Sequence, residues 1–128
     1  MNEKMSLGKE VENLTASIIG AAFEVSNTPG HGFLEAIYRR ALIHELSIRG
    51  LSVGEEVPFD VTYKEAALGR YYCDLIVEKA IIVELKAIDR LNPIHVGQLL
   101  NYMKAGGIHV GLLFNFGRPR LEYRRVLL

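Results

Sequence analysis

The chain has little of what several protein classes need. Its single cysteine, Cys73, excludes an internal disulfide and offers no zinc-ligand spacing. Lysine plus arginine and aspartate plus glutamate both number 15, so no overall basic field attracts nucleic acid, and any nucleic-acid surface has to be local. No apolar run approaches the ~20 residues of a membrane span, and the first residues, MNEKMSLGKEVENL, are too charged for a signal peptide. These absences favour a soluble, cytoplasmic protein.

What is present is the composition of a globular domain. Hydrophobic residues make up 49% of the 128 residues, and a chain of this length usually forms one domain. No repeat, low-complexity tract or linker divides it. We therefore expect a single domain over residues 1–128.

Apolar periodicity and turn residues predict the order of the elements. The pattern is ααββββαββ, or one strand fewer, which indicates an α/β fold with a mixed sheet flanked by helices. The predicted elements are, in order, helices 8–26 and 33–49, strands 51–63, 68–77 and 81–88, helix 93–105, and strands 108–116 and 121–128. In the second helix we expect an apolar stripe of Leu34, Ile37, Ala41, Leu42 and Leu46.

Three charged residues lie inside the two apolar strands of residues 70–87, RYYCDLIVEKAIIVELKA. They are Asp74, Glu84 and Lys86, and a lone buried carboxylate is so costly that charges there require an explanation. Because strand side chains alternate between faces, Glu84 and Lys86 project from the same face of the sheet.

The turn between these strands decides where Asp74 lies. A three-residue turn that pairs Val77 with Ile81 places Asp74 opposite Glu84, whereas a two-residue turn places it opposite Val83. In the first register two carboxylates converge, and they repel each other unless a cation lies between them. Oxygen ligands alone suit a hard ion such as Mg²⁺.

Two helices carry further candidates, each open to two interpretations. Glu35 falls in the first turn of the second helix, where the helix dipole favours a carboxylate, but it could equally face inward toward a metal. Gln98 and Tyr102 share a face of the third helix at i, i+4. They form either a polar surface stripe or a pair that contacts phosphate and orients the metal site.

The order Glu35, Asp74, Glu84-Leu85-Lys86 and Gln98 with Tyr102 resembles the PD-(D/E)XK nuclease superfamily. More closely, the segment GFLEAIY at residues 32–38 is similar to the motif of the GxxExxY protein family. The resemblance extends from about residue 8 to the C-terminus and includes the turn Asn115-Phe116-Gly117. Cys73, rather than proline, precedes Asp74, a position that varies within the superfamily.

The resemblance implies a restriction-endonuclease-like core and a metal-dependent phosphodiesterase. Glu35, Asp74, Glu84 and Lys86 would be the catalytic residues, and the three carboxylates with the carbonyl of Leu85 would ligate Mg²⁺ or Mn²⁺. Tyr38, Gln98 and Tyr102 would bind substrate or support the site.

The implied substrate is nucleic acid, with DNA expected rather than RNA, and a homodimer would let two small cores grip a duplex. Two alternatives stay open at this stage: a binding module that keeps the nuclease fold without activity, and a protein in which the charges form only a buried ion network. Arginines such as Arg39 and Arg40 could bind phosphate or could simply be solvated surface.

Overall fold

The computed structural model describes the backbone of residues 3–128 and the side chains of residues 8–128. Its elements follow the shorter of the two predicted orders, ααβββαββ. They are α1 (Glu3–Asn27), α2 (Glu35–Ile48), β1 (Val53–Tyr63), β2 (Ala66–Val77), β3 (Ile81–Lys86), α3 (Pro93–Gly106), β4 (Val110–Asn115) and β5 (Glu122–Leu127).

The five strands form one mixed sheet in the order β1-β2-β3-β4-β5. Only β3 and β4 run parallel, and α3 connects them, as a parallel pair requires a crossover. β1 is an edge strand, which explains how it tolerates Pro58 in its interior. The α/β class with a mixed sheet and flanking helices is therefore confirmed.

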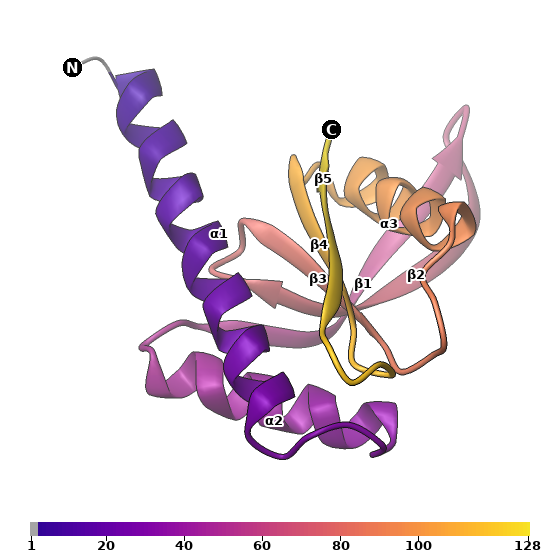
Figure 1. The fold of residues 1–128 in the computed structure, drawn as a ribbon. Helices are drawn as coiled ribbons and strands as arrows, with labels where there is room; N and C mark the ends of the chain where they lie inside the picture. Colours follow the sequence, from indigo (N-terminus) through magenta and orange to yellow (C-terminus); the bar gives the residue numbers. More distant parts are fainter. Residues whose placement is uncertain (1–2) are drawn as a thin grey trace.

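The helices cover the two faces of the sheet, with α1 and α2 on one face and α3 on the other (Figure 1). Strand alternation separates the two cores: Leu75, Val83 and Leu85 pack with α1 and α2, whereas Ile76 and Ile82 pack with α3. β4 is buried along its whole length, as expected of an interior strand covered on both faces. The first turns of α1 project beyond the sheet (Figure 1).

Close packing determines where α3 can lie. A Cβ on Gly111 of β4 would stand 2.7 Å from the sulfur of Met103, so any larger residue would require the ends of the Met103 and Leu99 side chains to shift. Asn92 caps the helix, since its side chain accepts from the N–H of Ile94 at 2.9 Å, and Pro93 follows at the first helical position. This start was predicted from the sequence.

The predicted bounds of several elements were wrong. α1 begins at Glu3 and not at residue 8, because a glycine at position 8 costs only about 1 kcal/mol inside a helix and does not end it. α2 begins at Glu35, with Leu34 extended before it. β3 ends at Lys86 and not at residue 88, because the backbone of Ile88 hydrogen-bonds to a side chain of β4 instead of to a strand.

The predicted apolar stripe of α2 was also partly wrong. Leu34 and Ile37 are exposed, and the buried residues of the helix are Tyr38, Leu42 and Leu46 at spacings of four. The rotation follows from Tyr38, whose ring stacks on Phe116 with 4.9 Å between ring centroids. Packing of this aromatic pair sets which side of α2 faces the core. Periodicity alone predicted Leu34 and Ile37 on that side instead of Tyr38.

Candidate active site

The site lies where β2 and β3 separate. Val77 pairs with Ile81 across the turn, as the three-residue turn predicted, and backbone pairing continues to Leu75 and Val83. The pairing ends at Leu75 and Val83. Asp74 and Glu84 are the adjoining residues, on the side where the two strands separate.

Two crossed hydrogen bonds replace the missing backbone pairs. The N–H of Asp74 donates to Glu84 Oε1 at 3.0 Å, and the N–H of Leu85 donates to Asp74 Oδ2 at 2.9 Å. One oxygen of each carboxylate thus accepts a hydrogen bond from the backbone of the other strand. The second oxygen of each carboxylate remains for another ligand, and Arg39 Nη1 of α2 lies 3.7 Å from Asp74 Oδ1.

Glu84 is the most perturbed carboxyl of the site. Its side chain is buried inside the sheet, and burial together with the adjacent Asp74 raises its pKa to about 9, an effect that Lys86 opposes only in part. At neutral pH the pair therefore holds a proton unless a cation replaces it. A buried carboxyl that needs a positive charge is typical of a functional site rather than of a stabilising ion pair.

Glu35 is the first residue of α2 and is half-buried. Burial and the negative charge of Asp74 raise its pKa, while Lys86 and Arg39 lower it. Glu35 therefore lies within electrostatic range of Asp74, Lys86 and Arg39, in addition to lying in the first turn, where the helix dipole favours a carboxylate. Within residues 8–128, however, no three histidine, cysteine, aspartate or glutamate side chains gather closely enough to hold a metal ion.

Tyr38 supports the loop that delivers Glu35 to the site. Its side chain is buried, its hydroxyl donates to the carbonyl of Gly30 at 2.8 Å, and the N–H of Phe33 donates to the hydroxyl at 3.2 Å. These bonds fix the chain just before Glu35. The buried Tyr38 hydroxyl thus links the backbone of Gly30 to that of Phe33.

Asn115, at the end of β4, holds the chain that follows Lys86, a role that the sequence analysis missed. It is fully buried; its Oδ1 accepts from the N–H of Ile88 and its Nδ2 donates to the Ile88 carbonyl, at 3.0 and 2.9 Å. The next residue, Phe116, donates its N–H to the Lys86 carbonyl at 2.8 Å. A buried asparagine at the end of an apolar strand was the available signal.

Gly117 completes this connection. A Cβ there would stand 2.3 Å from both the nitrogen and the carbonyl oxygen of Ile88, so no other residue fits without a shift of the backbone. The turn 115–117 therefore positions β3 and Lys86 through contacts that depend on its residue types.

α3 brings Tyr102 close to the carboxylates. Its phenol is half-buried, and burial followed by the negative charges of Glu84 and Asp74 raises its pKa. The ring meets Tyr71 of β2 edge to face, with 5.0 Å between centroids, and a hollow of about 100 Å³ opens there, lined by Tyr71, Gln98, Asn101 and Tyr102. Gln98 itself is exposed at the rim.

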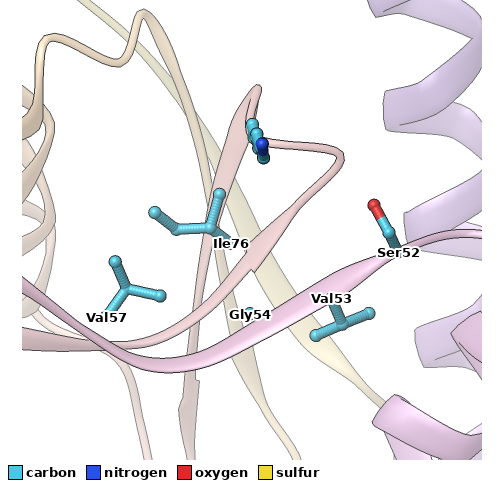
Figure 2. A pocket seen from close by; sticks show the side chains of 6 residues that line it. Ser52, Val53, Gly54, Val57 and Ile76 are labelled. Atoms are coloured by element: carbon cyan, nitrogen blue, oxygen red, sulfur yellow. The ribbon is translucent and has the colours of Figure 1, made fainter.

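Other cavities and arginines lie apart from these groups. An apolar hollow of about 390 Å³ is lined by Ser52, Val53, Gly54, Val57, Ile76 and Lys79 and contains none of the candidate residues (Figure 2). Among the C-terminal arginines, Arg125 bonds Glu12 of α1, and Arg118 donates to the carbonyl of Asp89 at 3.3 Å. Arg39 is the arginine that contacts the carboxylate pair.

Within the described residues, no helix combines the length and apolarity needed to cross a bilayer. The metal ion, the DNA substrate, the cytoplasmic location and the homodimer that the sequence analysis expected remain predictions.

Comparison with known proteins supports the same fold. The crystal structure of SSO0001 superimposes with a TM-score of 0.58 at 20% sequence identity, over 72% of this chain and 48% of that one. This chain thus spans about half the length of that protein, and the similarity concerns the fold alone. No curated protein sequence matches this chain. The family model of the PD-(D/E)XK nuclease superfamily matches residues 12–126, and the chain belongs to that superfamily.

Proposed function

We propose that the chain is a metal-dependent nuclease that hydrolyses phosphodiester bonds in DNA, with Asp74, Glu84 and Lys86 as its catalytic residues. The observation that carries the proposal is the crossed bonding of Asp74 and Glu84 at the point where β2 and β3 separate. It keeps two carboxylates adjacent in a largely buried place, which is unfavourable unless a cation compensates their charge.

The donor set fits a hard divalent ion, Mg²⁺ or Mn²⁺. Asp74 and Glu84 would hold it through the oxygens that the backbone does not engage, together with the carbonyl of Leu85. When bound, such an ion neutralises charge that develops on the phosphate and lowers the pKa of its water. Binding would also remove the proton that burial otherwise keeps on the pair.

Lys86 supplies the positive charge of the chain itself. Its positive charge lowers the pKa of both Glu35 and Glu84, so the lysine lies within electrostatic range of these carboxylates. There it would orient the attacking water and stabilise the charge that grows on a nonbridging phosphate oxygen. Asn115 and Phe116, which hold the backbone after β3, would keep it in place.

The remaining residues would act around this centre. Glu35 would hold water molecules beside the centre, at the start of α2. Arg39 would contact a phosphate once the ion neutralises the charge of Asp74. Gln98 and Tyr102 would steady the substrate strand along α3. A homodimer, a cytoplasmic location and the narrower similarity to the GxxExxY family belong to the same proposal.

Cleavage assays test the proposal. Labelled single-stranded, duplex and branched DNA would be incubated with Mg²⁺ or Mn²⁺ and with wild-type protein, Glu84→Ala or Lys86→Ala. We expect wild-type cleavage that EDTA abolishes and that both substitutions reduce by a factor of about 100 or more. Binding without cleavage on every substrate would instead indicate a recognition module, and activity that persists in both variants would refute the assigned site.

A further inference from the structure

A second, larger hollow continues from the candidate site along α3. It has a volume of about 500 Å³ and lies between α3 and the β1–β2 hairpin. It shares Tyr71 and Asn101 with the small hollow beside Tyr102, so the two form one path away from the carboxylate pair. A volume of this size is in the range that proteins use for small organic ligands.

The walls of this groove differ from those of the apolar hollow in Figure 2. Residues from both sides line it, with Asp60, Val61, Thr62 and Tyr71 from the hairpin and Asn101, Lys104 and Ala105 from α3. Lys104 lies in the last turn of α3 and is exposed. Asp60 forms an ion pair with Arg70 at 2.8 Å, so its negative charge is compensated and does not exclude an anionic ligand.

Tyr71 is the aromatic surface of the groove. Its side chain is 42% exposed, although a strand tyrosine could pack flat against the sheet. Tyr102 meets it edge to face at 73°, which holds the Tyr71 ring in place and leaves ring surface accessible. A fixed, exposed ring beside the amide of Asn101 and the ammonium of Lys104 matches the parts of one nucleotide: a base face, a base edge and a phosphate.

We propose that this groove binds one unpaired nucleotide of single-stranded DNA next to the phosphate that is cleaved. The base stacks on Tyr71, its edge contacts Asn101, and the adjoining phosphate contacts Lys104. Bases inside a duplex are stacked on each other and do not offer a face to Tyr71, so the groove selects single strands, overhangs or frayed ends. The inference rests on the proposed function in taking the ligand to be nucleic acid.

The test measures binding in EDTA, where metal-dependent cleavage does not occur. Labelled oligothymidylate and a duplex of equal length would be titrated with wild-type protein, Tyr71→Ala, Tyr71→Phe and Tyr72→Ala. Tyr72 is the matched control, because it is also exposed, at 59%, but points to the other face of β2. Oligouridylate serves as the RNA arm.

We expect Tyr71→Ala to weaken single-strand binding by a factor of at least about five, the lower end of what one stacked base contributes. Duplex binding changes by less than about twofold, and Tyr71→Phe and Tyr72→Ala stay close to wild type. Lys104→Gln reduces the salt dependence of single-strand binding by about one phosphate contact, a change of ~0.7 in slope.

Three results would overturn the inference: Tyr71→Ala equal to Tyr72→Ala, an equal loss for duplex and single strand, or no single-strand binding by the wild type. Tighter binding of oligouridylate than of oligothymidylate would assign the groove to RNA and refute the DNA assignment. Failure of the nuclease proposal looks different, because single-strand binding would depend on Tyr71 while no substrate is cleaved.

Discussion

Replacing Glu84 with glutamine should stabilise the metal-free protein at neutral pH. Glutamine has nearly the same shape, its carbonyl can still accept from the N–H of Asp74, and its amide can donate to the Asp74 carboxylate. What the substitution removes is the ionisable group whose pKa folding raises from 4.5 to about 9.

The sign and size follow from that shift. Because the folded chain binds this proton more tightly than the unfolded chain does, the stabilisation is complete below about pH 4.5 and is lost as pH rises toward 9. Each pH unit in this window costs about 1.4 kcal/mol. Between about pH 5 and 7.5 the wild type should lose about 3 kcal/mol of unfolding free energy through Glu84, and Glu84→Gln should not lose this part.

Urea unfolding in EDTA, followed by circular dichroism at both pH values, measures the difference. Glu55→Gln is the matched control, since it makes the same chemical change on an exposed residue of β1. We expect Glu84→Gln to be more stable than the wild type at the higher pH and less active in cleavage, as when a site is strained for function. Equal responses of Glu84→Gln and Glu55→Gln to pH would refute the burial of the Glu84 carboxyl.

Three further predictions concern the structure around the site. Burial raises the pKa of Cys73 to about 12, so iodoacetamide at about pH 8 should label it only in the unfolded protein; rapid labelling of the native protein would contradict its burial. Asn115→Ala leaves the N–H and carbonyl of Ile88 without partners and should destabilise the fold by about 3 kcal/mol in urea; a loss below about 0.5 kcal/mol would show that water replaces the side chain. Gly117→Ala should cost at least about 3 kcal/mol because its Cβ meets backbone, whereas Gly69→Ala, with open space around it, should be nearly neutral; equal effects would contradict the close contact.

Much of the fold could be predicted from local pattern. The turn between β2 and β3, the start of α3 at Asn92 and the buried character of β4 depend on short-range sequence signals, and the structure has all three. Alternation along β3 likewise placed Glu84 and Lys86 together before any tertiary contact was known.

What could not be predicted depends on contacts between distant segments. The contact between Tyr38 and Phe116 sets which side of α2 faces the core. Phe116 lies near the other end of the chain, so the local periodicity of α2 cannot reveal this contact. The crossed bonds of Asp74 and Glu84 arise because backbone pairing between β2 and β3 ends at Leu75 and Val83. No sequence signal marks where the pairing of two strands ends. The groove beside Tyr71 exists only once the hairpin lies against α3.

The proposed function requires the buried carboxylate pair to be a metal site. Calorimetric titration of Mn²⁺ into wild-type protein, Glu84→Gln and Lys86→Ala tests it most directly. We expect that the wild type and Lys86→Ala bind the ion, with proton release at about pH 7, and that Glu84→Gln binds it at least about tenfold more weakly. Undiminished binding by Glu84→Gln, or no binding by the wild type, would contradict it.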